Sequence, residues 1–447
     1  MITRRRFLAS SIIAGLAGPV TNLVSAAGST TPWRNWSGAL VSNPASRLAP
    51  ESEDELADMI KRTSGPIRPV GAGHSFAPLV PTDGSLLVLD RMSGVISHET
   101  ESLQATLWAG TRISETGPLL DGLGQAMFNL PDIDRQTLAG AIATSTHGTG
   151  KRLKSMSGYV TGLRLLTLNG EWFDLDEGNN ADLFHATQVS FGAFGVITRI
   201  SFQNREPFRL RTQEWIDKTE NVLERFDQAL EEHEHFEILP VIPSDHCLVV
   251  ANSETNDPLK APVEEDDGGE YLSTLDATPI MLRRALINTL AGEIEPTEAV
   301  SESFNALTNL RFDRFNEMEY SVPVQSGPDC LREILAIIER ESIDVVFPLE
   351  YRIVDGDDTW LGMFAGEPRI SISVHRLASH DYRPLFDAIE PIFWKFNGRP
   401  HWGKVHNLGY DELKNLYPRF DDFIALQTSL DPGGRMLNDH LKYLLGR

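Results

Sequence analysis

The stretch Pro69-Val70-Gly71-Ala72-Gly73-His74-Ser75-Phe76 places a histidine and a hydroxyl group directly after a glycine-rich turn. Glycine allows a backbone to turn sharply and to approach a ligand closely. Successive N–H groups in such a turn form a concave site for an anion, and Ser75 can donate a further hydrogen bond. The pattern predicts a pyrophosphate-binding loop with His74 beside the bound group. A tight turn without a ligand has the same composition, and the third glycine and following helix of the dinucleotide fingerprint are missing.

A second loop of small and hydroxyl side chains, Ala143-Thr144-Ser145-Thr146-His147-Gly148-Thr149-Gly150, follows further along the chain. Its composition also suits close backbone approach and hydrogen bonding to a ligand. Two loops of this kind favour a ligand site over two unrelated turns.

Polar side chains also alternate with apolar ones in two later segments. In 347–353, Glu350 and Arg352 share one face of an expected strand, because side chains alternate across a strand. In 369–375 the same rule puts Ser371, Ser373 and His375 on one face. A half-exposed sheet with a surface Glu/Arg pair is the simplest interpretation of these patterns alone.

The two loops and four further motifs resemble the vanillyl-alcohol-oxidase family of flavoproteins, which carry a PCMH-type FAD domain. Within it they are most similar to the sugar-1,4-lactone and alditol oxidase branch. The further motifs are Asn35-Trp36, 134–140, 192–198 and 398–406. The resemblance covers nearly the whole chain after the first 27 residues. It implies an FAD-dependent oxidoreductase that oxidises a hydroxyl of a sugar lactone or polyol by hydride transfer to flavin N5.

The resemblance implies a specific set of FAD-binding residues. His74 is expected to bond through a ring nitrogen to the flavin 8α-methyl group, although it could instead stiffen the loop by donating to a carbonyl. His147 is expected to be structural. The full set is Val70, Gly71, Ala72, Gly73, His74, Ser75, Pro131, Asp132, Thr137, Gly140, Thr144, Ser145, Thr146, His147, Gly195, Ile197 and His406.

The same resemblance assigns catalytic roles to four side chains. Glu350-Tyr351-Arg352 matches the Glu-x-Arg motif of the branch, so Glu350 is expected to accept from substrate hydroxyls and Arg352 to donate. His375 is expected to accept the alcohol proton. Arg352 and Lys404 are expected to stabilise developing negative charge. His401 and His406 stay open between packing and substrate contact.

The chain outside these motifs predicts an α+β fold. The expected order is a two-subdomain FAD-binding domain of PCMH type at 28–205, a mixed α/β substrate cap at 206–390, and a C-terminal segment at 391–447 that returns to the flavin domain. Apolar periodicity predicts helices at 51–62, 111–123, 219–232 and 329–340, and an exposed loop at 258–270. Strands are expected at 67–70, 86–90, 105–110, 161–168, 195–202, 209–215, 319–323, 345–353 and 369–376.

The N-terminus has the layout of a bacterial export signal. Thr3-Arg4-Arg5-Arg6 precedes an apolar run from Ile12 to Val24, and Ser25-Ala26-Ala27 offers small residues for a peptidase. A twin-arginine signal peptide at 1–27 is therefore expected, with a periplasmic or secreted protein exported in the folded state. A membrane anchor is the alternative, but the run is interrupted by glycine and proline and is short for a bilayer, so no stable membrane insertion is expected after cleavage.

Composition narrows the class further. The 447 residues carry a net charge of −23, which argues against nucleic acid as a partner. The two cysteines, Cys247 and Cys330, allow one disulfide, match no metal site and lie outside the flavin loops.

Three functions remain to be compared. Pro131 corresponds to a position near the flavin edge where the resemblance associates glycine or proline with oxidases, which favours molecular oxygen as the acceptor. A periplasmic dehydrogenase that passes electrons to a respiratory carrier is the alternative. An exported carbohydrate-binding protein without catalysis is a third hypothesis, which the presence of His74 and of the Glu350/Arg352 pair disfavours.

Overall fold

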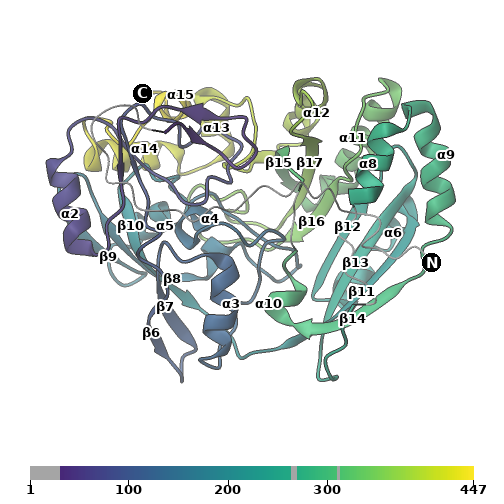
Figure 1. Cartoon of the computed structure of the whole chain (residues 1–447), viewed down its shortest axis with the longest axis horizontal. Coiled ribbons are helices and arrows are strands. Elements are labelled where there is room, and N and C mark those ends of the chain that lie inside the picture. The colour runs from purple at the N-terminus through teal and green to yellow at the C-terminus, as the bar shows by residue number, and fades with distance from the viewer. Residues whose placement is uncertain (1–30, 263–268, 310–312) are drawn as a thin grey trace.

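The computed structural model describes residues 31–262, 269–309 and 313–447. The expected signal peptide at 1–27 lies outside this range. The described chain forms two halves that stand side by side in Figure 1, with the N-terminal strands on one side and the large sheet on the other. Among the helices of the described ranges, none combines the length and apolar character that crossing a membrane requires.

The first half contains three sheets. A hairpin pairs β1 (Trp33–Arg34) with β2 (Val41–Ser42), and a parallel sheet has the order β3-β5-β4. An antiparallel sheet follows with the order β6-β7-β10-β8-β9. The remaining strands of this half are β3 (Ser46–Leu48), β4 (Ile67–Pro69), β5 (Ser85–Leu87), β6 (Val95–Glu99), β7 (Gln104–Trp108), β8 (Val160–Leu166), β9 (Trp172–Leu175) and β10 (Val196–Gln203).

Local signals explain the helices of this half. Helix α2 (Glu53–Arg62) begins after Ser52, whose side chain accepts from the Glu55 N–H, and it buries Leu56 and Ile60. Acidic residues in its first turn and basic residues in its last suit the helix dipole. The other helices of this half are α3 (Ile113–Asp121), α4 (Leu138–Ile142) and α5 (Ala181–Gln188).

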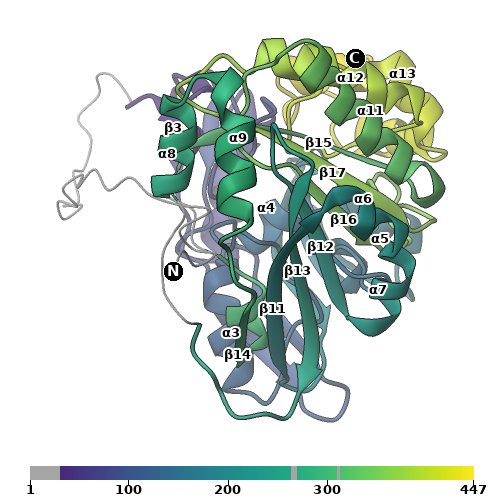
Figure 2. The same ribbon diagram turned by 90° about the vertical axis from the view of Figure 1, so that its right-hand side faces the viewer.

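The second half is built on one antiparallel sheet of eight strands with the order β14-β11-β13-β12-β16-β17-β15-β18. Its strands are β11 (Arg209–Lys218), β12 (His235–Pro240), β13 (His246–Thr255), β14 (Thr297–Glu302), β15 (Phe315–Pro323), β16 (Glu350–Val354), β17 (Arg369–Leu377) and β18 (Arg399–Pro400). Its helices are α6 (Thr219–Glu224), α7 (Phe226–Glu232), α8 (Gly269–Ala277), α9 (Ile280–Ala291), α10 (Ser303–Ala306), α11 (Gly327–Arg340) and α12 (Arg383–Lys395). Figure 2 shows α8 and α9 beside this sheet.

The C-terminal helices return to the first half, where Figure 1 places them above β6–β10. They are α13 (Tyr410–Leu416), α14 (Phe420–Leu430) and α15 (Asp439–Leu445). The Ile67 N–H donates to the Arg435 carbonyl, and the buried Arg68 guanidinium donates to carbonyls of Leu79, Phe191 and Gly192. Because β18 still pairs with β15 of the large sheet, the chain leaves that sheet after Pro400.

Several sequence expectations differ from the structure. The helix expected at 219–232 is interrupted at Arg225, which separates α6 from α7. The strand expected at 345–353 begins only at Glu350. The loop expected at 258–270 falls partly outside the described residues, and α8 begins within it at Gly269. Cys247 and Cys330 are buried free thiols, so the disulfide that their number allowed is absent.

Candidate active site

A single large cavity runs between the two halves. Its wall combines the Gly71–Ser75 turn, the loop after α4 and the start of β10 from the first half with β15, β16 and β17 from the second. Of the expected site residues, these line the cavity: Val70, Gly71, Ala72, Gly73, His74, Ser75, Pro131, Asp132, Thr137, Gly140, Thr144, Thr146, His147, Gly195, Ile197, Glu350, Arg352, His375 and Lys404.

Glycine is required in the first loop for two separate reasons. A Cβ at Gly71 would lie 2.2 Å from Oγ1 of Thr137, the residue whose side chain accepts from Gly140 N–H at the start of α4. Gly73 has a φ of +68°, and a Cβ there would approach the Trp33 ring at 3.3 Å. The loop is therefore a cradle that only an unsubstituted backbone can form.

Two of the expected cofactor residues do not line the cavity. Ser145 has a φ of +64°, and its buried Oγ has no hydrogen-bond partner within the described ranges. Because the backbone of Ser145 is left-handed, Ser145 does not line the cavity as its neighbours Thr144 and Thr146 do. His406 is buried beside Trp402 and His440, and burial lowers its pKa to about 3. Ser145 and His406 thus lie outside the cavity lining, and their part in binding the cofactor stays a prediction.

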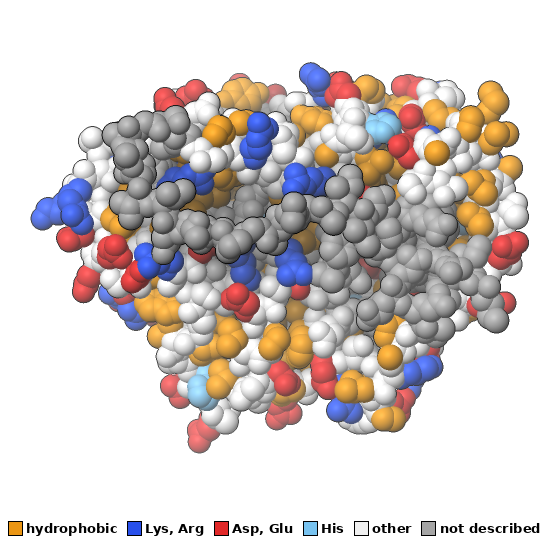
Figure 3. All heavy atoms as spheres, in the orientation of Figure 1, with side chains coloured by type: hydrophobic (Ala, Val, Ile, Leu, Met, Phe, Trp, Pro, Cys, Tyr) orange, Lys and Arg blue, Asp and Glu red, His pale blue; other side chains and the backbone are white. Residues whose placement is uncertain are grey.

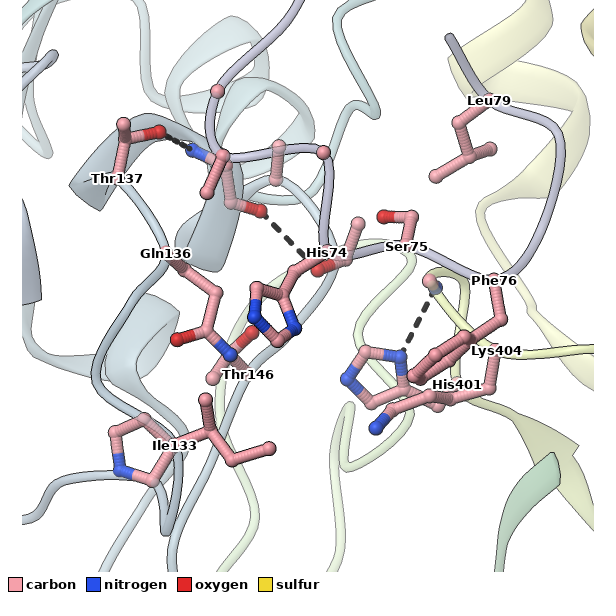
Figure 4. A pocket seen from close by; sticks show the side chains of 18 of the residues that line it. His74, Ser75, Phe76, Leu79, Ile133, Gln136, Thr137, Thr146, His401 and Lys404 are labelled. Atoms are coloured by element: carbon pink, nitrogen blue, oxygen red, sulfur yellow. Dashed lines mark hydrogen bonds between the residues drawn. The ribbon is translucent and has the colours of Figure 1, made fainter. Parts of the chain in front are cut away.

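His74 lies near the centre of the cavity. Figure 4 shows its ring between Gln136 and Thr146 on one side and His401 and Lys404 on the other. Its Nε2 atom is buried and has no hydrogen-bond partner among the residues described. Burial, followed by the nearby Lys404 charge, lowers the pKa of His74 to about 4, so the ring is neutral at pH 7.

The residues present fit an FAD. The glycine cradle offers close backbone approach to a diphosphate, as an anion site requires. The buried Nε2 atom of His74 has no hydrogen-bond partner in the described parts of the chain, so the protein itself gives this nitrogen no structural role. The same cavity is lined by this cradle and by charged residues of the large sheet, so a cofactor held by the loop would lie in one space with Glu350, Arg352 and His375.

The register of the large sheet brings the catalytic candidates together. Arg352 on β16 is opposite Glu237 on β12, and His375 on β17 is opposite Glu317 on β15. Arg352 Nη2 lies 2.9 Å from Glu350, and Arg352 Nε donates to Glu237 at 2.5 Å. The Glu350/Arg352 pair is thus buried in the cavity wall and is not a surface pair.

Sequence reasoning missed Glu317 and Glu319, which complete this cluster. The Lys404 ammonium contacts Glu317 and lies 3.8 Å from Glu319, while His375 Nε2 lies 3.5 Å from Glu317. Glu319 also accepts from the His147 ring, with a distance of 2.7 Å to Nε2. The alternation Phe315, Glu317, Glu319 along β15 is the signal that could have revealed them.

Charge pairing sets the protonation states in the cluster. Burial alone raises the pKa of Glu317, but Lys404 and His375 outweigh it and lower that pKa to about 2. Burial of His375 disfavours its charged form and by itself lowers its pKa. The nearby Glu317 carboxylate outweighs this effect, so the pKa of His375 is raised above its usual value. Burial raises the pKa of Glu350 despite Arg352.

Glu317, Glu350 and His375 also hold potential metal-ligand atoms within 4.8 Å of one another. Lys404 and Arg352 already pair with the two carboxylates. The charge that a divalent cation would supply is therefore already present as side chains.

A glycine cradle, a neutral, half-buried histidine and a wall of paired charges in one cavity are the features expected of a flavin-dependent oxidoreductase. Comparison with known proteins agrees with this class. Residues 44–176 match the FAD binding domain family and residues 200–444 match the D-arabinono-1,4-lactone oxidase family. The chain belongs to the D-arabinono-1,4-lactone oxidase family, with an FAD-binding domain of PCMH type.

Individual relatives match along almost the whole chain. L-gulono-1,4-lactone dehydrogenase of Mycobacterium tuberculosis is 32% identical over 93% of this chain and 99% of its own length. L-gulonolactone oxidase of Bos taurus is 28% identical, with 92% and 97% covered. Alditol oxidase of a Streptomyces species is 26% identical, with 93% and 99% covered.

The solved structures confirm the fold. A cholesterol oxidase variant from Brevibacterium sterolicum superposes with a TM-score of 0.76 at 15% identity, over 93% of this chain and 96% of the other. A solvent-stable cholesterol oxidase gives a TM-score of 0.75 at 16% identity, over 93% and 97%. The mixed α/β fold expected from the sequence is thus shared with these structures.

Proposed function

We propose that the protein is an FAD-dependent oxidoreductase that oxidises a hydroxyl of a sugar-1,4-lactone or alditol. The observation that carries this proposal is the convergence of Glu350, Arg352, His375 and Lys404 on the cavity that also holds His74. When bound, FAD supplies the hydride acceptor for the carbon that bears the hydroxyl.

The polar wall binds and orients the substrate. Glu350 accepts hydrogen bonds from hydroxyls, and the Arg352 fork donates to them in a fixed direction, because Glu237 and Glu350 hold the guanidinium on two sides. Lys404 stabilises the negative charge that develops on the substrate oxygen as its proton leaves. His375 accepts that proton on its ring, and the carboxylates of Glu317 and Glu350, which face Nε2, stabilise the imidazolium that forms.

An anaerobic stopped-flow screen of lactones and alditols tests the activity directly. Bleaching of the flavin absorbance by one of these classes supports the proposal. A protein that binds such compounds without bleaching would instead be a carbohydrate-binding protein.

Flavin attachment through His74 is the second part of the proposal. In this link a ring nitrogen of His74 would bond to the 8α-methyl carbon, each partner would lose a proton, and two electrons would pass to the acceptor that also serves turnover. The neutral ring and its place in the cavity lining support this link. The yellow colour should stay with the polypeptide after acid precipitation, and His74→Ala should release the flavin into the supernatant. Complete release of FAD from the denatured wild-type protein would contradict the link.

Molecular oxygen is the proposed acceptor, since Pro131 stands where the resemblance associates proline with oxidases and lines the cavity. The dehydrogenase named among the relatives favours a respiratory carrier as the second candidate. Mixing the substrate-reduced protein with oxygen and, separately, with a one-electron dye decides between them. Fast reoxidation by the dye and slow reoxidation by oxygen would assign a dehydrogenase.

Export by the twin-arginine route to the periplasm or beyond is also proposed, from Thr3-Arg4-Arg5-Arg6 and the short apolar run. Replacing Arg4, Arg5 and Arg6 by lysine should leave the precursor in the cytoplasm. Normal export of this variant would exclude the route.

A further inference from the structure

The N-terminal segment Asn35-Trp36 is hydrogen-bonded to the loop that carries His74, although the mechanism above gives this segment no role. The Trp36 N–H donates to the Gly73 carbonyl at 2.7 Å, and the Asn35 side-chain amide donates to the Ser75 carbonyl at 3.0 Å. Asn35 itself is buried and also accepts from the Leu40 N–H at 3.0 Å. The segment therefore fixes the backbone on both sides of His74.

Trp36 also fixes the side chain of His74. Its indole stacks on the imidazole with a centroid distance of 4.6 Å and an interplanar angle of 21°. Phe315 lies edge-on against the same indole at 5.1 Å, and Phe76 does so at 6.3 Å. Because Phe315 and Phe76 pack against the Trp36 indole, this ring is a fixed surface on which the His74 imidazole stacks.

Stacking matters here because the imidazole lacks another constraint. Nε2 of His74 has no hydrogen-bond partner in the part of the chain that the structure describes. Histidines that act as nucleophiles or ligands usually have their ring plane set by a hydrogen bond at the second nitrogen. In this chain the Trp36 plane replaces that bond.

We propose that Trp36, held in place by Asn35, is the positioning residue for covalent attachment of the flavin to His74. The inference rests on the covalent link of the proposed function. The bond formed is the one stated above, from a ring nitrogen to the 8α-methyl carbon, with loss of two protons and transfer of two electrons to the acceptor. Trp36 takes no part in the proton or electron transfer, and it acts only by holding the ring in a reactive orientation.

The test compares Trp36→Leu and Trp36→Phe with the wild-type protein. Total FAD per polypeptide is measured on the native protein, and covalent FAD is measured by flavin fluorescence in a denaturing gel and by intact mass. Stacking of two rings changes a population by roughly two- to tenfold. Trp36→Leu should therefore keep most of its total FAD, but its covalent FAD fraction should be several-fold lower than that of the wild-type protein after the same incubation time. Trp36→Phe should restore this covalent fraction.

Trp33→Leu is the matched control. Trp33 belongs to the same segment and packs with Val70 and Leu86 under the same loop. Its covalent fraction should match the wild-type protein, because the stack on His74 stays intact. If Trp36→Leu is insoluble, Asn35→Ala tests the same proposal. This variant removes the hydrogen bonds that hold the segment but keeps the Trp36 indole, and its covalent FAD fraction should fall.

The outcomes separate this inference from the proposed function. A wild-type protein without covalent FAD contradicts the His74 link itself, and the positioning role fails with it. A covalently flavinylated wild-type protein with an equal covalent fraction in Trp36→Leu or Asn35→Ala overturns only the role of Trp36. Equal losses in Trp36→Leu and Trp33→Leu also overturn it, because they would reflect general packing.

Discussion

Glu317→Gln is the substitution that most directly tests the charge network. Glu317 is buried between His375 and Lys404, with His375 Nε2 at 3.5 Å and the Lys404 ammonium in direct contact. The amide keeps the shape and removes the charge. His375 then loses the group that raises its pKa, while the burial that lowers this pKa remains.

The size of the shift follows from Coulomb's law. Two unit charges about 4 Å apart interact by about 4 kcal/mol at an effective dielectric constant of about 20. Removal of the Glu317 charge therefore takes away up to about 4 kcal/mol of stabilisation from the protonated His375 ring. Lys404 remains and disfavours the protonated ring, so the pKa of His375 is expected to fall.

The sign of the pH dependence is fixed by the role of His375. A proton acceptor must be neutral, so flavin reduction should rise with pH through the His375 pKa, which the Glu317 carboxylate raises above its usual value in the wild-type protein. In Glu317→Gln the same rise should occur at lower pH. The assay is the rate of anaerobic flavin bleaching at saturating substrate, measured across pH.

Glu319→Gln is the control for this experiment. Glu319 lies 3.8 Å from Lys404 but contacts His147 and Ser371 in place of His375. Its removal should change the maximal rate and leave the midpoint of the pH profile near the wild-type value. A Glu317→Gln profile with an unmoved midpoint, or one moved to higher pH, would refute the pairing of Glu317 with His375.

Four further outcomes are expected. Arg352→Ala and Lys404→Ala should each slow flavin reduction about a hundredfold with a nearly unchanged flavin spectrum, because each removes a donor to developing charge; stopped-flow bleaching measures this. Glu350→Gln should raise the KM for hydroxyl-rich substrates more than it lowers kcat in steady-state kinetics. Gly71→Ala should lower FAD occupancy of the purified protein, because the added Cβ would lie 2.2 Å from a threonine oxygen. Ring-opened sugar acids should be much poorer substrates than the neutral lactones in the same assay, since five carboxylates and three Lys or Arg side chains line the cavity.

Local pattern was enough to predict the parts of the site that lie within one element. The alternation in 347–353 placed Glu350 and Arg352 on the same face, and both line the cavity. The glycine turn before His74 was recognisable because its composition carries a backbone requirement. The roles given to these residues still await the experiments above.

Contacts across strands could not be predicted from the same patterns. Glu317 meets His375 because β15 and β17 are neighbours in a register that the chain order does not reveal. Ser145 and His406 lie outside the cavity lining because position within a motif does not fix side-chain direction. A positive φ turns one of them, and burial against Trp402 holds the other.

The large sheet explains why the site needs segments so distant in sequence. Each strand of β12, β16, β17 and β15 contributes charged or polar side chains to one face, and a single strand would leave these charges unpaired. An unpaired buried charge costs several kcal/mol, whereas a paired one is tolerated and rigid. Pairing also supplies the fixed direction that recognition of substrate hydroxyls demands. The stability of the cap sheet and the orientation of the catalytic groups therefore depend on the same ion pairs, so substitutions in this wall should be judged by melting temperature and flavin reduction together.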